Sequence, residues 1–259
     1  MSKFSVRGKD AGSSLNRLCT ADVNGAGDTI TYTQMLDEDG KVEADVTVMK
    51  QSNTHFVVIA TDTMHRHVET WLQRHLDPSG EKAVVVSDVT GAFAQLNLQG
   101  PLSRDILRSL VKEDTQFGGD GEHNNKDTDP FSEENFPFRA AKEIYVGCTI
   151  VRCARITYVG ELGFELHIPT EHARHVYDRL TQHCEELSSR GEVFGQGQTL
   201  VHGGLKALAS LRLEKGYRDY GHDVDNTDTL QESGLGFTAD FQKEGGFVGK
   251  SSLYCWHLV

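Results

Sequence analysis

The sequence lacks a long apolar run, a basic cluster and a recognisable targeting segment. Spanning a bilayer takes ~20 apolar residues, and no run in the 259 residues approaches that length. The formal net charge of -12, with a pI of about 5.4, disfavours binding to nucleic acid or to an anionic membrane. Residues 1–8 lack the apolar core of a signal peptide and the Arg/Ser-rich pattern of a transit sequence. We therefore expect neither a nucleic acid nor a membrane as a partner.

The cysteines and histidines also lack the spacing of metal sites. The five cysteines are odd in number and none falls in a Cys-x-x-Cys pair, which favours free thiols in a reducing compartment. The densest histidine group is His65, His67 and His75, on a segment with a helical pattern. Because His65 and His67 are two positions apart, they point in different directions on a helix. We expect no metal site and interpret these histidines as solvated surface residues.

The hydrophobic content of 37% is enough for one large domain or two intimately packed halves. Strands are predicted at 4–6, 29–36, 42–50, 56–61, 83–89, 93–98, 143–158 and 163–168, with a hairpin turn at 37–40. Helices are predicted around 15–18 and at 63–76, 101–112, 171–188 and 204–215. The alternation of strands with single helices predicts an α+β fold with mostly antiparallel sheets and flanking helices. The sequence contains neither a G-x-G-x-x-G nor a P-loop motif.

The composition changes abruptly at residue 113, where an acidic stretch rich in glycine and asparagine begins. Residues 113–134 have almost no aliphatic side chains and cannot bury enough apolar surface to offset their ordering entropy. We interpret them as an acidic flexible insertion, with an acidic docking loop as the alternative. Residues 1–112 are then the first α+β half and residues 135–250 the second.

Two segments have residue types suited to chemistry. Tyr158 to Glu165 joins two strands through a glycine-bracketed turn, where the backbone can approach a ligand closely. A tyrosine and two carboxylates there suit a heterocycle with several N–H donors, because carboxylates only accept hydrogen bonds. An ordinary hairpin with exposed glutamates is the simpler alternative. Asp45 lies on the polar face of its strand with Glu43 and Thr47, and its spacing alone does not make it catalytic.

A series of ordered motifs runs along the chain. They are TADV (20–23), YTQML (32–36), ADVTV (44–48), LQGPLSRDIL (98–107), TYVGELGFELHIP (157–169), SLRLEKGYR (210–218) and LQESGLGFTADFQK…FVGK (230–250). In this order and at these separations, they resemble the aminomethyltransferase (glycine-cleavage T-protein) family. The resemblance is closest to the branch fused to flavin-dependent sarcosine and dimethylglycine dehydrogenases, and it spans nearly the whole chain apart from the insertion.

The resemblance implies a T-protein-like fold around a central opening that holds tetrahydrofolate. It implies that Asp45 is the catalytic aspartate near the folate nitrogens, that Tyr158 lines the pterin pocket, and that Glu165 pairs with the N–H edge of the pterin. The other pocket-lining positions that it implies are Tyr32, Ile59 and Thr61. The reaction implied is capture of a one-carbon unit from oxidative N-demethylation as 5,10-methylenetetrahydrofolate, in the mitochondrial matrix of a eukaryote or otherwise in the cytoplasm.

The chain departs from the family pattern in several places. Leu208 and Ala209 stand where the T-protein has an arginine–aspartate pair. By resemblance, FAD belongs to a separate or missing oxidoreductase domain or subunit. Residues 251–259 are expected to be the truncated start of a C-terminal small β-barrel that is otherwise lacking. Two alternatives remain: a non-catalytic regulatory member, like the pyruvate dehydrogenase phosphatase regulatory subunit, and an incomplete product that does not fold stably.

Overall fold

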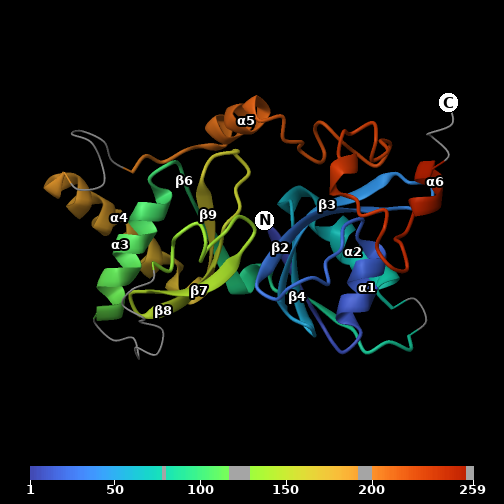
Figure 1. Cartoon of the computed structure of the whole chain (residues 1–259), viewed down its shortest axis with the longest axis horizontal. Helices are drawn as coiled ribbons and strands as arrows, with labels where there is room; N and C mark the ends of the chain where they lie inside the picture. Colours follow the sequence, from blue (N-terminus) through green and yellow to red (C-terminus); the bar gives the residue numbers. More distant parts are fainter. Residues whose placement is uncertain (78–79, 117–128, 192–199, 255–259) are drawn as a thin grey trace. The chain divides into compact units, whose positions relative to one another are not determined.

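The computed structural model describes residues 1–77, 80–116, 129–191 and 200–254, which divide into two compact units (Figure 1). Unit 1 contains residues 1–90 together with the described chain from Arg218 onward, and unit 2 contains Gly91–Tyr217. The units do not coincide with the expected halves at 1–112 and 135–250. Unit 1 is built from both ends of the sequence, because the last part of the chain packs against its first strands.

Unit 1 is a five-stranded antiparallel sheet with α-helices packed on one face and the short helix η4 (Gly236–Thr238) in contact with the other. Its strands are β1 (Ser2–Arg7), β2 (Thr29–Leu36), β3 (Val42–Ser52), β4 (His55–Ala60) and β5 (Val85–Asp88), and its helices are α1 (Ala11–Leu18), η1 (Asp62–Met64), α2 (His65–His75), η4 (Gly236–Thr238) and α6 (Lys250–Tyr254). The strand order is β2-β3-β4-β1-β5. Ala44, Val46 and Val48 of β3 are buried in a core with residues of α1 and α2. Since successive side chains of a strand point to opposite faces, Asp45 points away from these helices.

The predicted turn between β2 and β3 is fixed by an aspartate and a glycine. Asp37 Oδ1 accepts hydrogen bonds from the backbone N–H groups of Asp39 and Lys41, at 3.0 and 2.8 Å. Gly40 adopts φ +83°, which a side chain with a Cβ rarely tolerates. The turn therefore sets the register of β2 against β3.

Residues 218–254 are held against the rest of unit 1 by an apolar cluster and a buried lysine. The cluster consists of Leu36, Val42, Tyr220, Val224, Leu230, Leu235, Phe247 and Leu253. Lys243 Nζ donates hydrogen bonds to the carbonyl oxygens of Asn16, Cys19 and Ala21, the last at 2.9 Å. Burial lowers the pKa of Lys243 to about 8, so most of its ammonium groups are still charged at neutral pH. These contacts tie the far end of the sequence to the end of α1.

Unit 2 is a four-stranded antiparallel sheet covered on one face by two helices (Figure 1). After η2 (Thr90–Ala92), its elements are β6 (Phe93–Gln99), α3 (Ser103–Gln116), β7 (Ala141–Val146), β8 (Thr149–Ala154), β9 (Gly163–Pro169), η3 (Thr170–His172), α4 (Ala173–Arg190) and α5 (Leu205–Glu214). The strand order is β6-β9-β8-β7. Phe164 and Leu166 of β9 pack in a core with Leu107 of α3 and Leu180 of α4. Glu165 therefore points to the face that these helices leave uncovered.

The two sheets confirm the predicted α+β class, with antiparallel strands and flanking helices. The strands of the described ranges form two open sheets and no closed barrel. None of the helices within these ranges is long and apolar enough to cross a membrane.

Some segments differ from their predicted structure. The extended run at 143–158 is broken into β7 and β8 at Gly147, which adopts φ +57°, and β8 ends at Ala154. In the predicted insertion 113–134, α3 continues to Gln116, and Phe131 is buried in the core of unit 2 because its ring packs against other phenylalanines. Residues 117–128 of that prediction lie outside the described residues. At the expected start of a barrel, residues 250–254 form α6, and residues 255–259 lie outside the described residues.

Replacing Lys243 by methionine should lower the free energy of unfolding by about 1–3 kcal/mol, because carbonyl oxygens that are buried in the native state lose their donor. Urea denaturation followed by circular dichroism measures this loss. The matched control is Lys250→Met, which removes a single hydrogen bond to the Phe241 carbonyl at 2.7 Å and should cost less than about 1 kcal/mol. Equal losses in the two variants would contradict a special role for the buried ammonium.

Candidate functional site

Asp45 lies on β3 directly opposite Gln34 on β2. Gln34 Nε2 donates a hydrogen bond to Asp45 Oδ1 at 2.8 Å. Gln34 is fully buried, and its amide oxygen accepts a hydrogen bond from the hydroxyl of Thr238 on η4. The Tyr32 side chain also hydrogen-bonds to Asp45. The amide of Gln34 is therefore held with its NH₂ group toward the carboxylate, because its oxygen is engaged elsewhere.

The environment of Asp45 changes its acidity. Burial raises the pKa of the Asp45 carboxyl to about 6, from an ordinary value of 3.8. The hydrogen bonds from Gln34 and Tyr32 favour the charged form and oppose this shift, whereas the negative charge of Asp219 adds to it. A carboxyl with a pKa near 6 changes its protonation close to neutral pH, as a general acid or base requires.

The predicted pocket-lining residues of unit 1 lie beside Asp45 on the same sheet. Thr47 of β3 pairs with Tyr32 of β2 on one side and with Ile59 of β4 on the other. Because Thr47 and Asp45 are two positions apart on one strand, all four side chains share the face opposite to α1 and α2. Thr61 follows the last residue of β4 and is partly buried. Unit 1 thus gathers Tyr32, Asp45 and Ile59 on one sheet face.

Glu165 lies in unit 2, on the sheet face opposite to α3 and α4. Its Oε2 is 3.6 Å from His167 Nε2, and the two side chains are only 13% and 7% exposed. His167 pairs with Gln95 of β6 and with Arg152 of β8, so polar groups form a row across three strands. His167 Nε2 and Gln95 Oε1 are buried and make no hydrogen bond. Buried polar atoms of this kind are uncommon and mark places where a ligand or water supplies the missing partner.

Tyr158 begins the turn that leads into β9. Its ring centroid lies 6.3 Å from that of Tyr217. Gly160 adopts φ +71°, and a Cβ there would come within 2.0 Å of the Lys215 side chain, so the turn requires glycine. Lys215 Nζ lies 3.7 Å from Glu161 Oε1, and 52% of the Glu161 side chain is exposed. The alternative prediction for this turn, a hairpin with exposed glutamates, therefore holds for Glu161.

The three histidines predicted to be solvated are instead partly buried in unit 1, each beside a different partner. His65 Nδ1 lies 2.9 Å from the Ser2 hydroxyl, His67 Nε2 lies 2.9 Å from a carboxylate oxygen of Glu43, and His75 Nδ1 lies 2.9 Å from the Trp71 carbonyl oxygen. The amphipathic spacing that placed them on a surface did not reveal these polar neighbours, which come from other parts of the chain or from the preceding helical turn.

Sequence reasoning missed three residues around Asp45: Gln34, Thr238 and Asp219. A signal for Gln34 was present, since it follows Tyr32 by two positions and therefore shares its strand face. Thr238 and Asp219 lie in loops and a short 3-10 helix far along the sequence, and no periodic pattern connects them with β3.

The comparisons with known proteins agree with the motifs. The family model described as the GCVT N-terminal domain matches residues 1–243. A 4-methylaminobutanoate oxidase (formaldehyde-forming) of Paenarthrobacter nicotinovorans is 30% identical over 97% of this chain and 27% of its own length. The mitochondrial sarcosine dehydrogenase of Mus musculus is 28% identical over 97% of this chain and 26% of its own length. An aminomethyltransferase of Bacillus pumilus is 31% identical over 98% of this chain and 61% of its own length.

A solved structure confirms the T-protein-like fold. The glycine cleavage system aminomethyltransferase T of Bartonella henselae superposes with a TM-score of 0.74 at 20% identity, over 99% of this chain and 61% of that chain. The matches confirm the resemblance found in the motifs. This chain spans about a quarter of the oxidase and dehydrogenase relatives and about three-fifths of the aminomethyltransferase, so the similarity does not by itself transfer the activity of those whole proteins.

Replacing Asp45 by asparagine should stabilise the protein above pH 6 and have little effect near pH 4. Because the folded-state pKa of about 6 exceeds the ordinary 3.8, the folded state binds more protons between these values, and stability falls as the pH rises through this window. The variant avoids this loss and should gain about 1–3 kcal/mol at pH 8. Urea denaturation between pH 4.5 and 8 measures the difference.

The control is Asp39→Asn, at an exposed position of the β2–β3 turn. Its effect on the free energy of unfolding should stay within about 0.5 kcal/mol across the same range. A constant difference between Asp45→Asn and wild type at every pH would show that the carboxyl of Asp45 is not raised in pKa by folding.

Proposed function

The chain belongs to the GCVT N-terminal domain family, and from this premise we propose that it binds tetrahydrofolate and acts in one-carbon transfer. The observation that carries the proposal is the partly buried Asp45 carboxyl, held by Gln34 and with a pKa raised to about 6, at the position that the motifs mark as catalytic. Burying a carboxylate destabilises a protein. A role in proton transfer would explain why the chain places a carboxyl in this position.

Glu165 is proposed to recognise the pterin. Its side chain is 13% exposed and lies on the sheet face opposite to α3 and α4, where a carboxylate offers only acceptors. This suits the N–H edge of an aminopyrimidinone, which offers two donors side by side. Such a bidentate pair contributes about 1.5–3 kcal/mol when it is buried. The unsatisfied polar atoms of Gln95 and His167 beside it also fit a polar ligand.

Asp45 is proposed to hold and transfer a proton. Bound tetrahydrofolate supplies the pair of amine nitrogens that takes up the one-carbon unit. A carboxylate near such amines stabilises developing positive charge, and with a pKa near 6 it accepts and returns a proton at neutral pH. Tyr32 and Gln34 orient the carboxylate by their hydrogen bonds.

The one-carbon unit is proposed to come from oxidative N-demethylation, with 5,10-methylenetetrahydrofolate as the product. The names of the sarcosine dehydrogenase and the formaldehyde-forming oxidase among the relatives support this source. In this proposal the oxidation belongs to an FAD-dependent oxidoreductase domain or subunit, and the present chain provides the folate site. A eukaryotic form would work in the mitochondrial matrix, as the name of the mouse relative suggests.

A regulatory role without catalysis is the competing proposal. It needs the fold and a ligand site but no proton-transfer group. The raised pKa of Asp45 supports the catalytic proposal, because proton transfer uses a carboxyl that titrates near neutral pH and a regulatory role does not require one.

Titration calorimetry with tetrahydrofolate under reducing conditions tests the binding role of Glu165. Glu165→Gln should weaken binding by roughly 10- to 100-fold, since it replaces one acceptor oxygen by a donor facing the N–H edge. Glu161→Gln, in the same turn and half exposed, should bind like wild type. Asp45→Asn should bind within about threefold of wild type but lose formation of 5,10-methylenetetrahydrofolate from formaldehyde above the uncatalysed rate.

A folded wild type that binds no tetrahydrofolate would refute the proposed function. Equal weakening by Glu165→Gln and Glu161→Gln would refute the assignment of the pterin-binding carboxylate. Normal turnover by Asp45→Asn would refute the role of Asp45 in proton transfer, and binding by the wild type without turnover above the uncatalysed rate would favour the regulatory proposal.

Gln34→Met should shift the pH dependence of turnover. The hydrogen bond from Gln34 lowers the pKa of Asp45 against the effect of burial, so its removal lets the pKa rise above 6. The acidic limb of the rate profile should move up by roughly one pH unit, the equivalent of one hydrogen bond to a charged group. Thr238→Val, which removes the hydroxyl that holds the Gln34 amide, should shift the limb in the same direction by less. An unchanged profile in Gln34→Met would show that another group controls turnover.

A further inference from the structure

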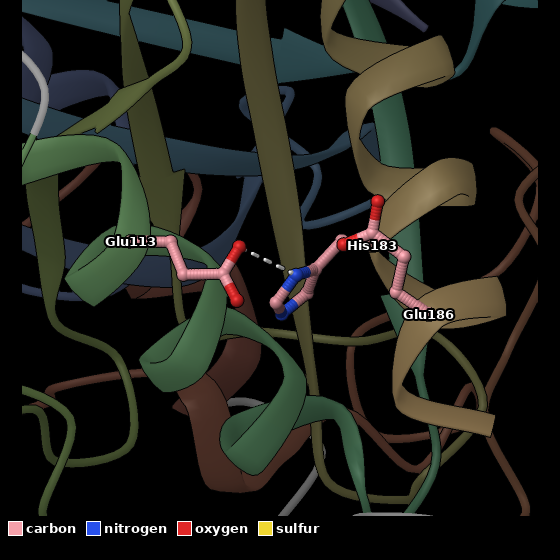
Figure 2. A group of neighbouring side chains, drawn as sticks. All are labelled: Glu113, His183 and Glu186. Carbon is pink, nitrogen blue, oxygen red and sulfur yellow. Dashed lines mark ion pairs between the residues drawn. The ribbon is translucent and has the colours of Figure 1, made fainter. Parts of the chain in front are cut away.

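A second cluster of titratable side chains lies between α3 and α4 of unit 2, apart from the residues proposed to handle folate (Figure 2). Glu113 comes from α3, and His183 and Glu186 come from α4. His183 and Glu186 are three positions apart and therefore share a helix face. One ligand atom from each of the three residues lies within 4.8 Å of the others. Figure 2 shows the Glu113 carboxylate directed at the imidazole of His183.

Ser109 lies where it can accept a hydrogen bond from His183 Nε2. Its Oγ lies 3.0 Å from the carbonyl oxygen of Ile106, to which it can donate its only hydrogen. The same Oγ lies 2.7 Å from His183 Nε2. When the hydroxyl donates to Ile106, Oγ accepts here and Nε2–H is the donor. The neutral imidazole then presents a bare lone pair at Nδ1.

The bare Nδ1 faces a carboxylate. His183 Nδ1 lies 3.3 Å from Glu113 Oε2, and the His183 side chain is 1% exposed. Nδ1 makes no well-formed hydrogen bond. Two acceptors at this separation repel each other unless a cation lies near both. A proton on Nδ1 and a metal ion are the two candidates for this cation.

The charges around the cluster also favour a cation. Three carboxylates, those of Glu113, Asp114 and Glu186, face the guanidinium groups of Arg179 and Arg190. The group as a whole therefore has one surplus negative charge. The contact of Arg179 Nη2 with Asp114 Oδ1, at 2.8 Å, is shorter than its contact with Glu113 Oε2, at 3.1 Å. Arg190 lies 3.9 Å from Glu113 and 3.7 Å from Glu186, so it holds both carboxylates weakly.

We propose that Glu113, His183 and Glu186 form a binding site for a divalent transition-metal ion of the Zn²⁺ class. One neutral imidazole and two carboxylates are ligands that Zn²⁺ accepts, with water in a fourth position. Ser109 acts as the outer partner that fixes the ring, since a histidine bound to a metal commonly donates its other N–H to such a group. Bound there, the ion links α3 to α4 across the core of unit 2. No metal was expected from the sequence, because the ligands lie 70 positions apart.

Zn²⁺ binding to the purified, metal-stripped protein tests the proposal. All variants carry Cys148→Ser, which removes an exposed thiol as a competing ligand. We expect one equivalent of Zn²⁺, displaced from a chromophoric chelator, and a dissociation constant that rises at least roughly tenfold in Glu186→Gln and in His183→Gln. Glu185→Gln, the exposed neighbour on α4, should bind like the parent protein. Co²⁺ in place of Zn²⁺ should give a visible absorption band that His183→Gln abolishes.

The partly exposed Glu186 keeps the test decisive if His183→Gln fails to fold. A folded parent protein without one-to-one Zn²⁺ binding would overturn the proposal, as would equal affinities of Glu186→Gln and Glu185→Gln. In either case a proton shared between His183 and Glu113 is the remaining explanation of the cluster.

Discussion

The hydrogen bond between Gln34 and Asp45 is the contact on which the candidate chemistry depends. Burial alone drives the Asp45 carboxyl toward its neutral form, and a neutral acid cannot serve as a base. Hydrogen bonds from the amide of Gln34 and the hydroxyl of Tyr32 stabilise the charged form and offset part of the effect of burial. The resulting pKa of about 6 is a balance of these opposing effects. Burial without the hydrogen bonds, or the hydrogen bonds without burial, would leave a carboxyl that is fixed in one protonation state at neutral pH.

That balance depends on the last part of the chain. Thr238, which holds the Gln34 amide, lies in residues 218–254, as does Asp219, whose charge raises the pKa of Asp45. Lys243 fixes the same segment to the end of α1. The acidity of Asp45 is thus a property of the closed unit 1, in which the first strands and the last segment are packed together. A change in that packing would change the pKa of Asp45 even if Asp45 itself were left in place.

Local sequence patterns predicted many of the strands and turns, because these elements depend mainly on neighbouring residues. The bounds of β2, the turn at 37–40 and the two-residue alternation of β3 all followed from the sequence, and the alternation placed Asp45 opposite to the buried valines. The division into units could not be predicted in this way, since it depends on residues 218–254 returning to the first sheet. Phe131 was misread for a related reason: its acidic surroundings predict an exposed stretch, and Glu133 and Glu134 are indeed exposed, but the ring of Phe131 is buried among other phenylalanines. Motif resemblance named Asp45 and Glu165, and only coordinates give their partners.

The sheet of unit 2 separates its two candidate sites. Phe164 and Leu166 face the core beneath α3 and α4, whereas Glu165 faces the other side of the same strand. The group of Glu113, His183 and Glu186 lies in the helix layer, so the sheet stands between it and the polar row of Glu165 and His167. An ion at that group cannot contact a ligand held by Glu165. Its effect would be to hold two helices in place beneath the sheet, and hence to stiffen the strand that presents Glu165.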